Sequence, residues 1–193
     1  MQRDNHYDVA FRAYLRELRI PHLAVDESRR ALMRDQSLKS VDFIVSPPDA
    51  KSMLVDVKGR RFPSGREGKG NQWENWVTED DIESLLKWQE IFGEGFRSAL
   101  IFVYDLVEPR YAAQFPETFV FRERRYACCG VWADEYRNEM RERSASWGTV
   151  TLPRRAFHEL RQPLSQLLGR SSREDGPDSN CAENTEAETP AQT

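Results

Sequence analysis

A length of 193 residues suits one domain, and 39% hydrophobic with 31% charged residues is the composition of a globular protein with a well-charged surface. No apolar run approaches the roughly 18 residues of a membrane-spanning helix, and the polar start of the chain does not resemble a secretory signal. The three cysteines lack zinc-finger spacing and agree with a reducing compartment, so we expect a cytoplasmic protein without membrane contact or structural zinc.

The net charge of −4 comes entirely from the C-terminal end of the chain. Residues 169–193 hold two basic and six acidic side chains and no large aliphatic or aromatic one, so residues 1–168 are neutral. A segment of this composition cannot bury enough apolar surface to offset the entropy of ordering it. We therefore expect one folded domain over residues 1–168 and a disordered acidic tail over residues 169–193. A neutral domain does not coat nucleic acid by charge alone, but it can carry a local basic patch.

The first predicted element is an amphipathic helix over residues 5–19. Its apolar side chains recur at helical spacing, and Pro21 marks its end. A short strand is expected over residues 22–25, followed by a polar, helix-compatible stretch to Asp35.

A β-hairpin is predicted next, because residues 41–46 and 53–57 are β-branched and aromatic around the turn Pro47–Lys51. If these five residues form the turn, Asp42 faces Asp56 across the hairpin. Directly opposed side chains in an antiparallel pair have Cβ atoms roughly 4.5–5.5 Å apart. A register slip of one residue would remove this pairing.

The second half of the chain predicts a sheet strand between helices. Thr78 caps a helix that runs to Phe92 and ends at Gly93, and the apolar run 98–106 suits a central strand buried on both faces. Further strands are predicted over residues 118–121 and 125–132, and further helices over residues 133–143 and 154–168. The order predicts a mixed α/β fold with one sheet flanked by helices.

The facing carboxylates of Asp42 and Asp56 indicate a metal site. Two carboxylates on an otherwise apolar sheet repel each other and need a compensating positive charge. A divalent cation such as Mg²⁺ or Mn²⁺ supplies it, and Lys58 projects from the same strand face as Asp56. Such a site can neutralise charge and activate water for phosphodiester hydrolysis, with Lys58 as base or electrostatic stabiliser.

The segment after Lys58 adds a candidate nucleic-acid contact. Residues 59–71 are rich in glycine and basic side chains and are expected to form a loop that is well placed to bind phosphates. The alternative is a mobile loop that is only exposed to solvent, as most such loops are. The basic residues of this predicted loop are Arg60, Arg61, Arg66 and Lys69. Trp73 and Trp76, at its end, fit apolar anchoring better than base stacking.

Three functions stay open at this point: a hydrolase, a nucleic-acid-binding module and a protein-interaction domain. An Asp-x-Lys on a strand is, by itself, more often an exposed ion pair than a catalytic site. The alternatives to a hydrolase are a catalytically inactive nucleic-acid-binding module and a protein-interaction domain that uses the acidic tail. The complete set of Asp42, Asp56 and Lys58 favours the enzyme.

The order of helix, Asp42 strand, Asp56-Val57-Lys58 strand and helix resembles the PD-(D/E)XK nuclease superfamily. The chain is more closely similar to the bacterial HYExAFE proteins, whose motif is matched by residues 6–12, His-Tyr-Asp-Val-Ala-Phe-Arg. Residues 38–43, 54–60 and 73–77 also resemble that family. The resemblance covers about residues 5–106. It implies a restriction-endonuclease-like α/β core with a mixed central sheet.

The superfamily resemblance implies a nuclease of DNA or RNA that uses Mg²⁺ or Mn²⁺, and it leaves a homodimer open. An acid on the first helix often joins the metal site in the superfamily, and Asp8 is the matching residue beside Asp42 and Asp56. A polar group on the following helix often points into the site, and Gln89 matches it. A hydrogen-bonded buried amide explains Gln89 equally well.

The chain departs from the family patterns at three positions. Asp8 and Arg12 stand where the HYExAFE motif has Glu, and the shorter side chain of Asp8 reaches less far. Val41 precedes Asp42 where the superfamily motif has Pro. The nuclease function is implied by the superfamily alone.

Overall fold

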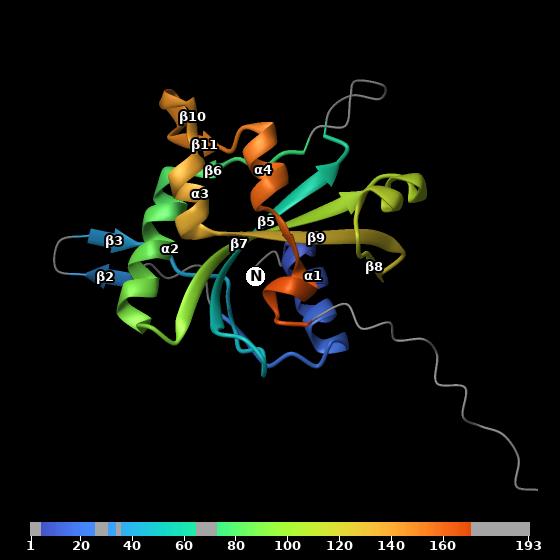
Figure 1. Ribbon diagram of the computed structural model, residues 1–193, viewed down its shortest axis with the longest axis horizontal. Coiled ribbons are helices and arrows are strands. Elements are labelled where there is room, and N and C mark those ends of the chain that lie inside the picture. The colour runs from blue at the N-terminus through green and yellow to red at the C-terminus, as the bar shows by residue number, and fades with distance from the viewer. Residues whose placement is uncertain (1–4, 26–30, 34–35, 65–72, 171–193) are drawn as a thin grey trace, which may run out of the picture.

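The computed structural model describes residues 5–25, 31–33, 36–64 and 73–170, and its centre is a curled, mixed β-sheet (Figure 1). The sheet has seven strands in the order β1-β4-β5-β7-β9-β12, with β8 paired to β9. Strands β5 and β7 are parallel, and the other pairs are antiparallel. The strands are β1 (His22–Ala24), β4 (Phe43–Val45), β5 (Ser52–Phe62), β7 (Phe96–Leu106), β8 (Phe119–Phe121), β9 (Arg124–Trp132) and β12 (Gln162–Pro163).

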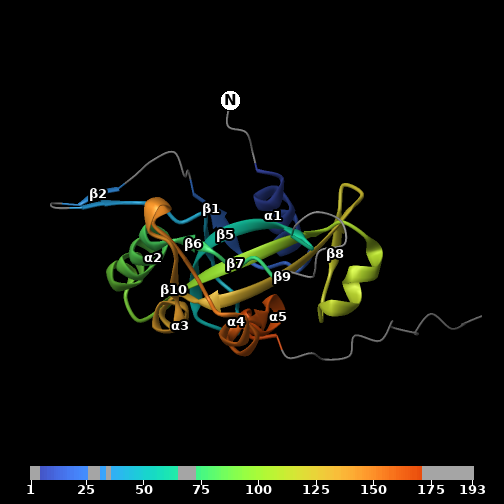
Figure 2. The same cartoon turned by 90° about the horizontal axis from the view of Figure 1, so that it is seen from above.

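Helices cover both faces of this sheet, with α1 on one side and α3 and α4 on the other (Figure 2). Buried side chains of α1 and α5 form one core with the sheet, and those of α2, α3 and α4 form the second. The helices are α1 (His6–Glu17), α2 (Glu79–Phe92), α3 (Ala133–Glu139), α4 (Arg154–Leu160) and α5 (Leu164–Leu167). The predicted mixed α/β architecture is therefore confirmed.

Strand β5 shows how the two cores divide the side chains. Met53, Val55 and Val57 are buried against α1, whereas Leu54 and Phe62 are buried on the side of α2. Successive strand residues point to opposite faces, so Asp56, Lys58 and Arg60 lie on the α2 side.

Two small sheets and two short 3₁₀ helices complete the fold. A three-stranded sheet has the order β10-β11-β6 and lies at the N-terminal end of α2 (Figure 1). Its strands are β6 (Val77–Thr78), β10 (Arg141–Ser144) and β11 (Thr149–Thr151). The other elements are the hairpin β2 (Ala31–Met33) and β3 (Gln36–Leu38), and the 3₁₀ helices η1 (Pro109–Gln114) and η2 (Ala145–Trp147).

Several predicted boundaries were wrong. Strand β5 continues past Val57 to Phe62, because its parallel pairing with β7 extends to Phe62 and Leu106. The stretch before Asp35 contains a strand, β2, in place of helix. The predicted helix over residues 154–168 is broken by Pro163, which cannot donate a backbone hydrogen bond within a helix.

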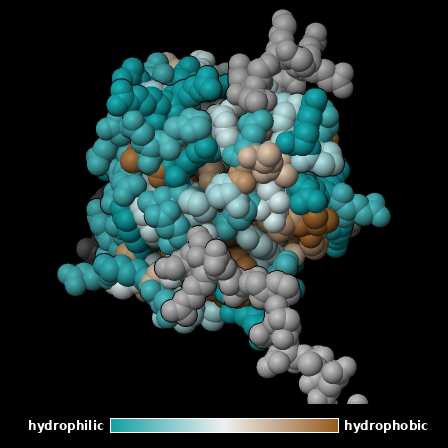
Figure 3. Space-filling model, turned by 45° about the vertical axis from the view of Figure 1, so that its right-hand side comes forward, coloured by the Kyte–Doolittle hydropathy of each residue, from teal (hydrophilic) through white to brown (hydrophobic). Residues whose placement is uncertain are grey.

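The C-terminal end of the packed core reaches Leu168, which is fully buried. The acidic tail predicted over residues 169–193 lies outside the described residues, apart from Gly169 and Arg170. Within the described residues, none of the helices has the length and apolar character needed to cross a membrane. The surface seen in Figure 3 is mostly hydrophilic, with small, separate hydrophobic patches.

Packing of α1 on β5 requires a glycine at position 59. A Cβ atom there would lie 2.1 Å from Cδ2 of the Tyr7 ring. We predict that Gly59→Ala lowers the free energy of unfolding by about 1–3 kcal/mol, as overpacking does. Urea denaturation measures this effect.

Two further variants test the cause of this destabilisation. Gly95→Ala adds a methyl group where no heavy atom lies within 4 Å, so its unfolding free energy should stay within about 0.5 kcal/mol of the natural protein. Adding Tyr7→Ala should make Gly59→Ala nearly neutral. Equal stability of Gly59→Ala and the natural protein would contradict the close packing of α1 on β5.

Candidate active site

The hairpin of β4 and β5 has the predicted register. Phe43 pairs with Val55 and Val45 with Met53, and the Asp42 backbone N–H donates to the Val55 carbonyl at 2.9 Å. Asp42 therefore lies beside Asp56, as the turn length predicts. The Asp42 carboxylate also accepts a hydrogen bond from the Val57 backbone N–H at 2.6 Å, which fixes it against β5.

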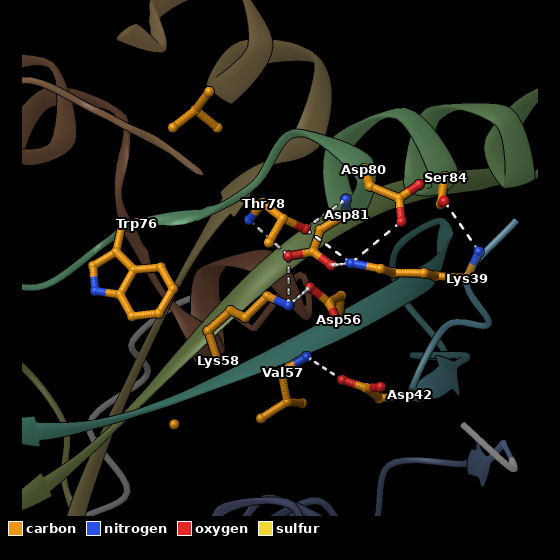
Figure 4. A network of polar contacts seen from close by, with 12 residues as sticks. Lys39, Asp42, Asp56, Val57, Lys58, Trp76, Thr78, Asp80, Asp81 and Ser84 are labelled. Atoms are coloured by element: carbon orange, nitrogen blue, oxygen red, sulfur yellow. Dashed lines mark hydrogen bonds and ion pairs between the residues drawn. The ribbon is translucent and has the colours of Figure 1, made fainter. Parts of the chain in front are cut away.

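Lys58 connects β5 to helix α2. Its Nζ lies 2.7 Å from Asp56 Oδ2 and 3.0 Å from Asp81 Oδ2 (Figure 4). The three side chains meet between the sheet and the first turn of α2, where Asp81 is 8% exposed. Lys58 thus bridges two carboxylates from separate elements.

Asp81 was not among the predicted site residues, and its position follows from the helix cap. The Asp81 carboxylate accepts from the Thr78 backbone N–H at 2.9 Å, and the Thr78 hydroxyl accepts from the Asp81 N–H at 3.2 Å. This reciprocal capping box holds Asp81 in one rotamer. The sequence signal was an acid directly before Ile82 on the buried stripe of α2, at the third position of the helix.

Lys39 is a second residue that the prediction missed. Its Nζ lies 2.7 Å from Asp81 Oδ1 and donates to the Thr78 hydroxyl at 2.9 Å. Its backbone is fixed on α2, because its N–H donates to Ser84 Oγ at 3.1 Å and its carbonyl accepts from Trp88 Nε1 at 2.7 Å. Asp81 is therefore held between two ammonium groups.

The cluster contains more carboxylates than ammonium groups. Asp42, Asp56 and Asp81 are buried or nearly so, and the two facing ammonium groups belong to Lys39 and Lys58. Burial raises the pKa of Asp56 despite the opposing charge of Lys58. An additional positive charge would therefore stabilise the ionised form of Asp56.

Lys58 and Asp81 have the opposite tendency and favour their charged forms. Burial lowers the pKa of Lys58, but the carboxylates of Asp56 and Asp81 outweigh it and raise that pKa overall. Burial also disfavours the Asp81 carboxylate, yet Lys58, Lys39 and the Thr78 N–H lower its pKa to about 2. Both groups are therefore charged at neutral pH.

The carboxylates of Asp42 and Asp56 suit a divalent cation that takes oxygen ligands and needs few of them from the protein. Asp42 and Asp56 offer carboxylate oxygens from facing strands. The pKa of Asp56 is raised by burial, so a further positive charge beside it would favour its ionised form. Among the described residues, no three His, Cys, Asp or Glu side chains are grouped to hold a metal. Mg²⁺ fits such a pair, because it is usually held by one or two carboxylates and keeps several waters.

Two predicted site residues lie elsewhere. Asp8 is on α1, which packs on the other side of the sheet from Asp56 and Lys58, so the three predicted ligands are not brought together. Gln89 accepts a hydrogen bond from the Ser98 backbone N–H at 2.6 Å. Gln89 is thus a hydrogen-bonded amide in the packing of α2 on the sheet, which was the alternative explanation given for it. Asp81 is the residue that α2 contributes to the cluster.

The predicted basic loop is partly strand. Arg60 and Arg61 belong to β5, and Arg66 and Lys69 lie outside the described residues. Arg60 is nearly buried: it donates to the carbonyls of Gly59 and Trp76 and stacks on the Trp76 ring. Arg61 is exposed and lines a cavity of about 740 Å³ that does not include the acidic cluster.

Comparison with known proteins identifies the fold. No family model and no curated protein matches the chain, so the similarity to the HYExAFE proteins stays a prediction. The structure of Archaeoglobus fulgidus Hjc, a Holliday junction resolvase from an archaeal hyperthermophile, superposes with a TM-score of 0.50 and 8% sequence identity. The match covers 85% of this chain and 98% of the resolvase chain. The chain therefore has a restriction-endonuclease-like fold.

Asp81 should stabilise the protein in a pH-dependent manner. Its pKa is lowered on folding, so its contribution is present above pH 4 and is lost as the pH falls toward 2. We predict that Asp81→Asn lowers the unfolding free energy by about 2 kcal/mol at pH 7 and by progressively less below pH 4. Urea denaturation over this pH range measures the difference.

Asp80→Asn is the matched control, because Asp80 lies 3.4 Å from the same Lys39 but is 46% exposed. Its effect should be below about 1 kcal/mol, as for exposed ion pairs. A difference between Asp81→Asn and the natural protein that stayed constant with pH would contradict the assigned charge state of Asp81.

Proposed function

We propose that this protein is a metal-dependent nuclease that hydrolyses phosphodiester bonds of DNA or RNA. The observation that carries the proposal is the pairing of Asp42 with Asp56 beside Lys58, on a fold shared with a Holliday junction resolvase. The superposed resolvase supports nucleic acid as the substrate class. Asp42 and Asp56 would hold Mg²⁺ or Mn²⁺, which supplies charge neutralisation and an acidified water when bound.

Lys58 acts in this proposal as an electrostatic stabiliser. The carboxylates of Asp56 and Asp81 keep its ammonium charged, so it is a poor proton acceptor at neutral pH. A positioned cation in a nearly buried site stabilises negative charge that develops on the phosphoryl oxygens. Asp81 and Lys39 are positioning residues, because Asp81 pairs with Lys58 and Lys39 in turn pairs with Asp81.

Arg61 is the described residue of the predicted basic set that best suits a phosphate contact. Its side chain is exposed near the end of β5, but because it follows Lys58 by three residues it points to the opposite face of the strand, toward the cavity beside α1. Arg124 and Arg125 line the same cavity but are engaged by Asp105 and Thr118. Arg61 would contact the backbone of a substrate that extends past the end of β5 to the α1 side, without reading sequence.

The proposal predicts cleavage that depends on both metal and Lys58. With Mg²⁺ or Mn²⁺, the natural protein should degrade labelled DNA or RNA, and EDTA should abolish this. Asp56→Asn and Lys58→Ala should each lower the cleavage rate by a factor on the order of 10² or more, since each removes charge stabilisation in the transition state. Gel-based cleavage assays on single-stranded, duplex and branched substrates measure the rates.

Lys87→Ala is the matched control, because Lys87 is an exposed lysine of α2 that pairs with the exposed Glu90. Its cleavage rate should equal that of the natural protein. Absence of cleavage with every substrate and metal, together with retained nucleic-acid binding, would favour an inactive binding module over a nuclease.

A further inference from the structure

The hairpin of β10 and β11 is held to the rest of the protein by hydrogen bonds and buried side chains at its base. The Asn75 side chain accepts hydrogen bonds from the Leu152 N–H at 2.9 Å and the Thr151 hydroxyl at 2.7 Å. Thr149 and Val150 are buried, and Val150 pairs with Val77 of β6. Because its base is fixed in the core, the tip of this hairpin keeps a defined position.

The hairpin tip adjoins the candidate active site. The Gly148 carbonyl accepts from the Glu79 N–H, the first residue of α2, at 2.9 Å. Thr149 pairs with Thr78, the residue that caps Asp81. The tip is therefore linked by backbone contacts to the turn of α2 that holds Lys58.

Trp147 lies at this tip with its ring in solvent. It is 76% exposed, the highest value among the large hydrophobic side chains of the described residues. Its neighbours along the chain are Ser146 and Gly148, and the left-handed backbone of Gly148, with φ of 54°, turns the chain directly after the ring. An isolated aromatic ring among polar neighbours does not form the broad apolar patch of a protein interface, which needs roughly 800 Å² per partner.

Cationic side chains connect the β10–β11 hairpin to strand β5 through the Trp76 ring. The pairing of β10 with β11 shifts between Glu142 and Ser144, so Arg143 is the extra residue of a β-bulge. Bulges redirect side chains, and the Arg143 guanidinium carbon lies 5.0 Å from the centre of the Trp76 ring. Arg60 stacks on the same ring at 4.3 Å and shares a strand face with Lys58. Figure 4 shows Trp76 on the side of β5 where Lys58 meets Asp81.

We propose that the β10–β11 hairpin binds an unpaired segment of nucleic acid, with a base stacked on Trp147 and a phosphate at Arg143. This inference rests on the proposed function and specifies its substrate class. An unpaired base offers a free face to the exposed ring, whereas the bases of a duplex are already stacked on each other. The exposed Arg143 side chain carries the charge that a phosphate requires, and it lies against Trp76, the ring on which Arg60 of β5 also stacks.

Binding without cleavage tests this inference. In EDTA, fluorescence anisotropy of labelled oligothymidylate and oligouridylate of about 12 nucleotides gives the Kd for unpaired strands, and a duplex of equal length gives the comparison. Trp147→Ala should weaken single-strand binding by about 5- to 100-fold and leave duplex binding unchanged. Trp147→Phe should retain most of the affinity, because it keeps an aromatic face.

Two variants separate stacking and charge from general surface effects. Arg143→Gln should reduce the slope of log Kd against log salt by about 0.7, the value for one phosphate contact on a single strand. Leu23→Ala is the control for an exposed hydrophobic side chain, since Leu23 is 62% exposed on β1 of the seven-stranded sheet, and it should leave the Kd unchanged.

The outcomes distinguish this inference from the proposed nuclease. Single-strand binding by Trp147→Ala equal to that of the natural protein, an equal loss for duplex, or no oligonucleotide binding at all overturns the inference. Loss of single-strand affinity in Trp147→Ala supports it even if no cleavage occurs with any metal, in which case only the catalytic proposal fails. Metal-dependent cleavage with single-strand affinity unaffected by Trp147→Ala leaves the nuclease and removes the hairpin contact.

Discussion

The arrangement of the candidate site depends on two carboxylates brought to facing positions in the β4–β5 hairpin. Asp42 is anchored by the Val57 N–H, and Asp56 is directly opposite on β5, between the buried residues Val55 and Val57. Burial of this pair costs free energy that no hydrophobic contact repays. The surrounding residues are best understood as the groups that compensate for it: Lys58 on the same strand, and through Lys58 the first turn of α2.

The cap of α2 serves both helix formation and the electrostatics of the site. Asp81 completes the capping box with Thr78 and, with its other contacts, holds Lys58 and Lys39. The capping box that begins α2 therefore also fixes the ammonium group of Lys58 relative to Asp56. The same turn is joined to the β10–β11 hairpin, because the Glu79 N–H donates to the Gly148 carbonyl. The first turn of α2 therefore links the Lys58 ammonium group, the carboxylates and the hairpin tip.

Local sequence patterns predicted the parts of this structure that are set by neighbouring residues. The five-residue turn set the hairpin register, and Thr78 and Gly93 marked the ends of α2, because caps and turns depend on short-range geometry. Contacts between distant elements were not predictable in this way. Asp81 was not recognised as a site residue, since its contact with Lys58 depends on how α2 crosses β5. Gln89 was considered for the site because it matches the polar group that the superfamily often carries on this helix, but helix packing directs it to Ser98.

Binding of Mn²⁺ to the full chain tests the central claim most directly, because it depends on the carboxylate pair and not on finding the natural substrate. Electron paramagnetic resonance of free Mn²⁺ at neutral pH should show one site per chain, with affinity lost in Asp42→Asn and in Asp56→Asn and retained in the exposed control Asp80→Asn. Mn²⁺ affinity equal in all four proteins, or no binding by the natural protein, would contradict the account.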